Sequence, residues 1–146
     1  MNMISAQDIL NSTGTACPTN GKIGRRVNTQ TVKALLGLSL NVLRSVEYRF
    51  CPDPNCPTVY YSVDGLQTFV ESDLRERIYQ KHPTESGVFI CYCFRHTLGD
   101  ILSDPSAPIL DEINLGVING QCACDIRNPQ GNCCLGNVSA AIKNNK

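Results

Sequence analysis

The feature that most constrains this chain is its cysteine content, nine cysteines in 146 residues. Three lie in the first half, at Cys17, Cys51 and Cys56, and six in the second, at Cys91, Cys93, Cys122, Cys124, Cys133 and Cys134. So many thiols exceed what packing needs, and in an intracellular protein such spacing favours metal binding over disulfides. The number is also odd, so any all-disulfide scheme leaves a thiol over. We expect soft-metal sites, with a disulfide scaffold as the alternative.

Composition argues against several other classes. Thirteen basic residues balance thirteen acidic ones, which gives no electrostatic footprint for nucleic acid. The first residues lack the basic segment and long apolar core of a secretory signal. The longest apolar run, residues 88–94, is far below the roughly 20 residues that span a bilayer. The sequence therefore predicts a soluble, cytoplasmic protein with no nucleic-acid partner and no membrane insertion.

Turn signals and apolar spacing predict an α+β fold in two lobes. Residues 1–15 show no convincing periodicity and are expected to form a loose tail. Residues 16–80 are predicted to form a zinc-binding lobe, a small zinc-stapled antiparallel β meander with short helices. Residues 81–87 are the expected linker. Residues 88–146 are predicted to form a small helical lobe with a second cysteine site, a candidate 2Fe-2S or zinc site.

In the first lobe, strands are expected over residues 22–27, 47–50, 58–63 and 66–70, with a hairpin turn at Asp64-Gly65. Asn28 or Thr29 is expected to cap a helix whose apolar face carries Val32, Leu35 and Leu36. A second helix, capped by Ser72, is expected to carry Leu74 and Ile78 and to end at Pro83.

In the second lobe, a short strand over residues 88–90 is expected to lead into Cys91. Thr97 and Asp100 have the spacing of a capping box, which predicts a helix that begins there. A further helix carrying Ile113 is expected to stop at Asn119-Gly120, after a break over residues 104–108. A last amphipathic helix is predicted from the spacing of Leu135, Val138 and Ile142.

The three upstream cysteines are the candidate zinc ligands. Structural zinc takes four tetrahedral ligands from two short-spaced knuckles. Cys51 and Cys56 form one knuckle and Cys17 half of the other, but Asn20, a poor zinc ligand, stands where the second sulfur would be. Water, His82, Asp53 or Cys122 could complete the site, or the site could be lost and leave three buried thiols. Because a lobe with so little apolar sequence needs a staple, we expect the metal to be retained.

The downstream cysteines are the candidate cluster ligands. A 2Fe-2S cluster takes four thiolates, two for each iron. Cys91 and Cys93 can serve one iron, and Cys124 with either Cys133 or Cys134 the other. Zinc could also occupy four thiolates, so spacing alone does not choose the metal. Two neighbours are interpreted more simply, Arg95 as a counter-charge or surface residue and His96 as locally satisfied rather than ligating.

Taken in order, these motifs resemble the N-terminal domain of CopZ-type copper chaperones over roughly residues 16–143. The resemblance rests on Cys17-Pro, Tyr48-Arg-Phe-Cys51-x4-Cys56-x2-Val59-Tyr60-Tyr61, Cys91-Tyr-Cys93-Phe and Cys124-x3-Asn128-Pro129-x-Gly131-x-Cys133-Cys134. It implies a zinc lobe followed by a 2Fe-2S lobe related to bacterioferritin-associated ferredoxin.

Carried over residue by residue, the resemblance implies zinc ligands Cys17, Cys51 and Cys56, with Asn20 in place of the family's fourth cysteine. It implies cluster ligands Cys91, Cys93, Cys124 and, by preference, Cys133, with Cys134 the competitor. The family also has a heavy-metal-associated domain with a Met-x-Cys-x-x-Cys loop. Residues 1–146 contain no such motif, so copper delivery by that loop is not expected.

Two functions follow as hypotheses. The first is an iron–sulfur and zinc metallochaperone-related protein that handles copper or another soft metal through one-electron transfer or redox sensing. Its expected partners are metal ions and a copper transporter, a separate copper chaperone or a redox protein. The second is a non-catalytic module with purely structural metals that docks on a metal transporter or regulator. No Cys-x-x-Cys redox pair or convincing Cys/His catalytic arrangement stands out, so we expect no enzyme and no catalytic residues.

Overall fold

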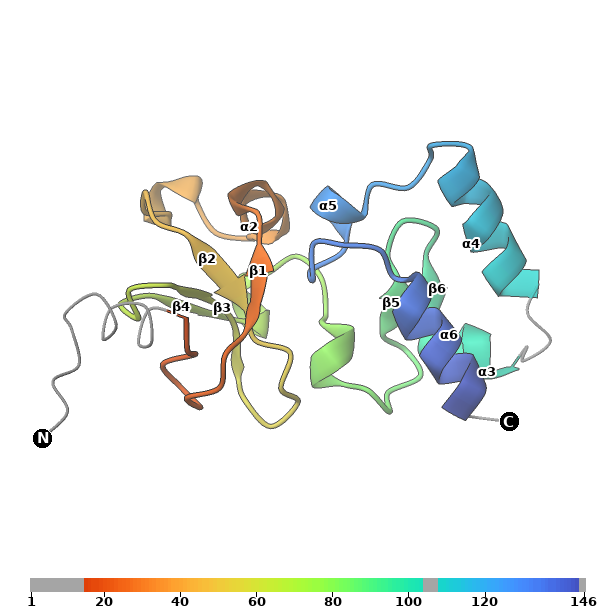
Figure 1. The fold of residues 1–146 in the computed structure, drawn as a ribbon, viewed down its shortest axis with the longest axis horizontal. Coiled ribbons are helices and arrows are strands. Elements are labelled where there is room, and N and C mark those ends of the chain that lie inside the picture. Colours follow the sequence, from red (N-terminus) through yellow and green to blue (C-terminus); the bar gives the residue numbers. More distant parts are fainter. Residues whose placement is uncertain (1–14, 104–107, 145–146) are drawn as a thin grey trace, which may run out of the picture.

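A computed structural model describes residues 15–103 and 108–144. The chain forms two neighbouring parts, a four-stranded antiparallel sheet with α2 against it and a more helical C-terminal part (Figure 1). The predicted α+β class is therefore confirmed. The expected tail falls almost entirely on residues 1–14, which lie outside the described residues, as do residues 104–107 of the expected break.

The sheet is a simple meander with the strand order β1-β2-β3-β4. Its strands are β1 (Arg25–Val27), β2 (Tyr48–Phe50), β3 (Thr58–Ser62) and β4 (Thr68–Val70). Each predicted strand is present but shorter than expected. At the β3–β4 turn, Gly65 has a φ of +73°, in the left-handed region that glycine adopts without strain. The Asp64 carboxylate accepts the N–H of Leu66 at 3.1 Å and holds the same turn closed.

The first core lies between this sheet and α2 (Thr29–Leu35). Val32, Leu35 and Leu36 are all buried, which confirms the predicted apolar face. Asn28 occupies the N-cap position, but its side chain makes no capping hydrogen bond. Aromatic side chains on the sheet supply most of the opposing surface, because Tyr48, Phe50 and Tyr60 are fully buried. Large rings bury much apolar area per residue, which suits a lobe this small.

The helix predicted after Ser72 is absent. The segment contains only two 3-10 turns, η2 (Glu71–Asp73) and η3 (Tyr79–Lys81), and a third, η1 (Leu40–Val42), lies upstream. Leu74 forms an isolated bridge with Leu36, and the N–H of Arg75 donates to the Leu35 carbonyl at 2.7 Å. The backbone groups that a helix would use are thus bonded to the end of α2. This prediction was wrong because tertiary pairing overrides local spacing.

The second part packs helices around a short hairpin. Its elements are β5 (Phe89–Cys91), β6 (His96–Thr97), α3 (Leu98–Ser103), α4 (Pro108–Ile118), α5 (Cys124–Arg127) and α6 (Leu135–Asn144). The predicted capping box is confirmed, because Thr97 and Asp100 each accept the other's backbone N–H. The predicted stop at Gly120 is also confirmed, with a φ of +70°. The core between β5, α3, α4 and α6 is centred on Ile90, Ile101, Ile113 and Val138.

The two parts are joined by more than the intervening chain. Helix α5 packs against α2, and the Thr31 hydroxyl donates to the Asp125 carbonyl at 2.5 Å. The loop after α5 then reaches the sheet, where the Tyr60 hydroxyl donates to the Pro129 carbonyl at 2.5 Å. Gly131, with a φ of +81°, lies directly against α2 and β1. The segment that carries the last cysteines is therefore positioned by the first lobe.

Across the described ranges 15–103 and 108–144, no helix combines the length and apolar character that crossing a membrane would need.

Candidate metal centres

Cys17 lies in a tight turn that closes on itself. The N–H of Cys17 donates to the Lys22 carbonyl at 2.8 Å, and the N–H of Gly21 donates back to the Cys17 carbonyl at 2.8 Å. Gly21 has a φ of +75°, so the reversal uses a residue that tolerates this backbone. The predicted knuckle is present.

Cys51 and Cys56 flank a second turn, between β2 and β3. The N–H of Cys51 donates to the Val59 carbonyl at 2.7 Å, which continues the strand pairing past the end of β2. The N–H of Cys56 donates to the Asp53 carbonyl at 3.1 Å, and the Asp53 carboxylate accepts the N–H of Asn55 at 2.9 Å. The turn therefore directs both sulfurs to the same side.

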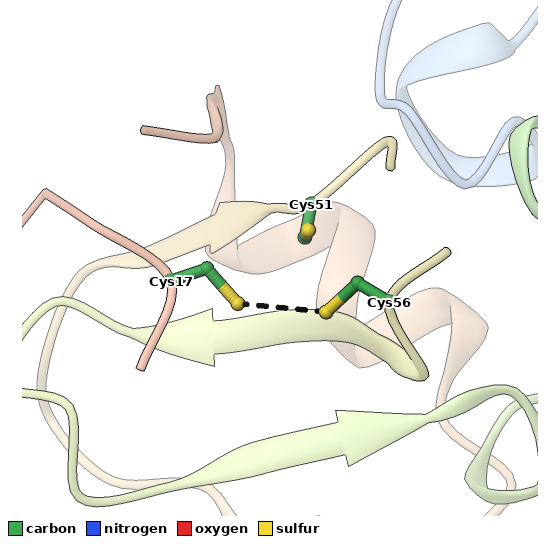
Figure 2. A group of neighbouring side chains, drawn as sticks. All are labelled: Cys17, Cys51 and Cys56. Atoms are coloured by element: carbon green, nitrogen blue, oxygen red, sulfur yellow. Dashed lines mark hydrogen bonds between the residues drawn. The ribbon is translucent and has the colours of Figure 1, made fainter. Parts of the chain in front are cut away.

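These two turns bring the three sulfurs together. The Sγ atoms of Cys17, Cys51 and Cys56 all lie within 4.8 Å of one another, and those of Cys17 and Cys56 are 3.9 Å apart (Figure 2). Four sulfurs at about 2.3 Å from a tetrahedral zinc are separated by about 3.8 Å. All three side chains are buried, with Tyr61 packed beside them. The donor type, spacing and burial therefore fit a thiolate-bound zinc.

The environment shifts the pKa values of Cys51 and Cys17 in opposite directions. Burial raises the pKa of Cys51 to about 11. At Cys17 burial also raises the pKa, but hydrogen bonds from the N–H groups of Asn20 and Thr19 and with the Cys56 and Cys51 thiols together outweigh it and leave the thiol pKa lowered. The Lys81 ammonium lies beside the site, where it donates to the carbonyls of Asp53 at 2.7 Å and Cys56 at 2.8 Å. This ammonium offsets the negative charge that ligating thiolates would bring.

No further His, Cys, Asp or Glu among the described residues joins the three-sulfur group. The suggested fourth ligands are placed elsewhere. His82 is paired with Glu71 at 2.8 Å, Asp53 with Lys22 at 2.9 Å, and Cys122 belongs to the C-terminal part. Asn20 does reach the site, but its Nδ2 lies 3.5 Å from the Cys51 sulfur, as a hydrogen-bond donor.

Four thiols converge in the second part of the chain. Cys91 ends β5, Cys93 lies in the hairpin turn, Cys124 begins α5 and Cys134 directly precedes α6. The sulfurs of Cys93 and Cys124 are 3.5 Å apart. The Cys134 thiol is hydrogen-bonded to both Cys91 and Cys124 and so completes the group.

The fifth candidate, Cys133, lies apart from these four. Its side chain is exposed, and its sulfur accepts the N–H of Leu135 at 3.5 Å. Cys134, by contrast, is buried in the second core. The geometry thus favours Cys134 over the preferred Cys133 as the fourth member.

Hydrogen bonds polarise the four-thiol group. Hydrogen bonds between Cys124 and the thiols of Cys134 and Cys93 lower the pKa of Cys124. The same bonds raise the pKa of Cys134 and of Cys93. The N–H of Ala123 donates to the Cys93 sulfur at 3.1 Å, a contact that also stabilises a thiolate ligand. The hydrogen bonds at Cys124 favour negative charge on its sulfur, and the N–H of Ala123 does so at Cys93.

The two polar neighbours of this group each face a carboxylate on another element. Arg95 pairs with Glu76 at 2.6 Å and lies over the Phe89 ring at 3.7 Å. Its φ of +62° is the single non-glycine left-handed value among the described residues. The Nε2 atom of His96 lies 3.4 Å from the Glu112 carboxylate. Arg95 therefore acts as a surface ion-pair residue, and His96 faces a carboxylate.

Sequence reasoning missed the amide of Asn20 as a donor to sulfur, the ammonium of Lys81 and the short helix α5. The first two contacts join residues about 30 positions or more apart, so no local pattern reports them. For the choice of Cys134 a signal did exist. Cys134, Val138 and Ile142 recur every four positions and are all buried, which is the spacing of one helix face.

The fold and its buried three-thiol group define a thiolate metal-binding protein. Residues 14–75 match the family model of the CopZ type described as "Zinc binding domain". The whole chain is also similar to the X-ray structure of the Archaeoglobus fulgidus CopZ N-terminal domain. The identity is 26%, the TM-score is 0.66, and the match covers 86% of this chain and 95% of that one. No curated protein sequence matches the chain.

The expected resemblance to the CopZ N-terminal domain is thereby confirmed, and with it zinc binding through the upstream cysteine cluster.

Proposed function

We propose that this chain is a non-catalytic, two-site metalloprotein of soft-metal handling, with zinc in the first lobe and a 2Fe-2S cluster in the second. The observation that carries the proposal is that Cys91 and Cys93 of the β5–β6 hairpin lie near Cys124 at the start of α5 and Cys134 just before α6. Four thiolates are the number and kind of ligand that a 2Fe-2S cluster takes. When bound, such a cluster supplies one-electron transfer.

The chain's own residues prepare the second site for an anionic group. Hydrogen bonds with Cys134 and Cys93 lower the pKa of the Cys124 thiol, and the N–H of Ala123 is directed at the Cys93 sulfur. The inner side of the thiol group lies in the second core, which includes Cys91 and Cys134 themselves. Burial of this kind excludes water and lowers the local dielectric, which are two means by which a protein tunes a reduction potential.

The partial exposure of Cys93 supports an electron-transfer role. Cys91, Cys124 and Cys134 are buried, whereas Cys93 is partly exposed in its turn. A site with one edge near the surface can pass single electrons to a docked partner, for example to keep copper as Cu(I). The proposed partners are metal ions together with a copper transporter, a separate copper chaperone or a redox protein. We place this activity in the cytoplasm, where thiols stay reduced.

The decisive experiment is anaerobic purification followed by iron, acid-labile sulfide and zinc analysis on the sample used for a visible spectrum. Two irons, two sulfides and about one zinc for each chain are the stoichiometry expected for a 2Fe-2S cluster and one structural zinc. Cys91→Ser and Cys93→Ser should each abolish the visible bands and leave zinc bound. Cys122→Ser is the matched control, because it removes a thiol outside the four. Zinc without sulfide in the wild type would refute the cluster.

A second candidate is a binding module whose metals are purely structural. It is favoured by two large apolar side chains on the outer side of α4, Leu115 and Ile118, which are 59% and 79% exposed. They are three positions apart and so share a helix face. Reversible one-electron reduction would favour the first candidate, and a cluster that cannot be reduced at accessible potentials would favour the second.

A further inference from the structure

The first-lobe site presents three thiolates to a metal that takes four ligands. What occupies the fourth position therefore decides whether the site is closed and structural or open to exchange. Each polar side chain that reaches the group has to be considered in turn.

Asn20 cannot supply the fourth ligand in its present orientation. Its Nδ2 faces the Cys51 sulfur at 3.5 Å and the Asp53 carboxylate at 3.2 Å. Its Oδ1 accepts the N–H of Lys22 at 2.9 Å. Exchanging the two amide atoms would set Oδ1 against a carboxylate and lose the bond from Lys22. The network therefore fixes the NH₂ group toward the sulfur, and an amide nitrogen that donates hydrogen bonds does not ligate metal.

The other nearby groups are engaged as well. The Asp53 carboxylate accepts from Lys22 and from the N–H of Asn55, both at 2.9 Å, in addition to Asn20. The Tyr61 hydroxyl donates to the Thr15 carbonyl at 2.6 Å and accepts the N–H of Gly24 at 2.8 Å. Its hydrogen-bonding capacity is therefore already used. Among the described residues, no further His, Cys, Asp or Glu joins the three sulfurs to close the site.

The surface beside the knuckles is hollowed on two sides. A hollow of about 320 Å³ is lined by Cys51, Pro52, Asp53 and Lys22 among others. A second, of about 490 Å³, is lined by Cys56, Pro57, Lys81 and His82 among others. Each hollow thus reaches one of the ligand-bearing residues and contains one lysine. Each hollow gives a small thiol room to approach the ligand-bearing turns.

We propose that the metal held by Cys17, Cys51 and Cys56 keeps its fourth position open and takes a thiolate from another molecule there. This inference rests on zinc binding by the first lobe and is independent of the second thiol group. Thiolate is the fitting class because three sulfur ligands already select soft metals and soft partners. Binding would form one metal–sulfur bond, displace the water that otherwise takes the fourth position and release the thiol proton to buffer, and no atom would change oxidation state. The site is then an exchange site rather than a staple alone.

Cobalt(II) substitution tests this proposal, because charge transfer from sulfur to cobalt grows with the number of thiolates. Co(II)-loaded full-length protein is titrated with glutathione, after cobalt content has been measured. The wild type should show a saturable increase of about one third in the charge-transfer band, as three thiolates become four. Asn20→Cys should begin with the four-thiolate spectrum and not respond. Asn20→Ala, which adds no ligand, should respond like the wild type. The second thiol group is identical in the wild type and both variants, so cobalt bound there contributes equally to all three spectra.

The outcomes separate the possible failures. Bound cobalt with no response in the wild type, an equal response in Asn20→Cys, or loss of cobalt to glutathione would each overturn the open position while leaving metal binding intact. No bound metal in the first lobe would overturn zinc binding itself. A second titration uses a folded protein with one exposed cysteine. A response to glutathione alone identifies the source as a small thiol, and a response to both extends it to a partner protein.

Discussion

The Tyr60 hydroxyl donates a 2.5 Å hydrogen bond to the Pro129 carbonyl, which lies 69 positions further along the chain. Tyr60 is at the middle of β3, in the zinc-binding lobe, whereas Pro129 lies in the loop between two ligand candidates of the other lobe. Burial strongly raises the pKa of this phenol, so it remains a neutral donor at all physiological pH values. The bond fixes the C-terminal loop to the sheet.

Removing this hydroxyl should loosen the second thiol group. Tyr60→Phe leaves a buried carbonyl without its donor, at a cost of about 1–3 kcal/mol in the free energy of unfolding. Alkylation of Cys124 and Cys134 in the native protein should become faster, as measured by mass spectrometry. Tyr48→Phe is the control, because its hydroxyl bonds Gln67 within the first lobe. Equal acceleration in both variants would show that the Tyr60 contact has no special role.

Gly131 tests the same junction through the backbone. Its φ is +81°, and an added Cβ would lie 3.2 Å from both Thr31 Oγ1 and Val27 Cγ2. Gly120 has a similar φ of +70°, but an added Cβ there meets nothing within 4 Å. Each Gly→Ala change should cost about 1–2 kcal/mol for the left-handed backbone. Gly131→Ala should cost more in urea unfolding, because it also forces α2 and the loop apart. A smaller loss than in Gly120→Ala would contradict tight docking.

The adjacent pair Cys133 and Cys134 gives a matched test of the second site. Cys134→Ser should abolish the visible absorbance of anaerobically purified protein, because this thiol contacts both Cys91 and Cys124. Cys133→Ser should leave the spectrum unchanged, since its side chain is exposed. The reverse result would assign the ligand to Cys133 and require the start of α6 to rearrange.

Acid should weaken the first lobe partly through its hairpin turn. Arg44 and then Ser62 hold the pKa of Asp64 well below its ordinary value of 3.8. Because the folded-state pKa is depressed, this carboxylate contributes stability that is fully present above its ordinary pKa and lost as the pH falls toward the folded-state pKa. Asp64→Asn should therefore flatten the decline in stability below about pH 4.

Urea unfolding at several pH values measures this effect. Asp111→Asn, on the exposed part of α4, is the control that removes the same charge away from the turn. If the wild type and Asp64→Asn lose stability in parallel below pH 4, the Arg44 contact does not contribute to acid sensitivity.

The parts of the fold that follow from local rules could be predicted from the sequence. Val32, Leu35 and Leu36 form a buried face, and Thr97 with Asp100 forms a reciprocal cap, because both depend on residues one helical turn apart. The helix after Ser72 could not be excluded in this way. The Glu71 carboxylate accepts the N–H of Ile78 at 2.8 Å, and the end of α2 takes up neighbouring backbone groups.

In the candidate sites, too, features set by local sequence could be predicted, and features set by long-range contacts could not. The grouping of Cys17 with Cys51 and Cys56 was predictable because each knuckle is a local turn. The amide orientation of Asn20 was not, because Asp53 helps to set it from 33 positions away. Cys134 lies between these cases. Its four-residue spacing from Val138 indicates the buried face, but that spacing matters only once the start of α6 is known.

The docking of the loop after α5 onto α2 also has a consequence for synthesis on the ribosome. The first lobe emerges first, and N-terminal units generally fold first. The surface of α2 around Thr31 therefore stays exposed to solvent until Asp125 and Gly131, which pack against it, have left the exit tunnel. Binding of zinc at this stage would keep the first lobe folded while the second lobe is still being synthesised. Zinc and the proposed cluster would then be loaded in the order in which their lobes are synthesised.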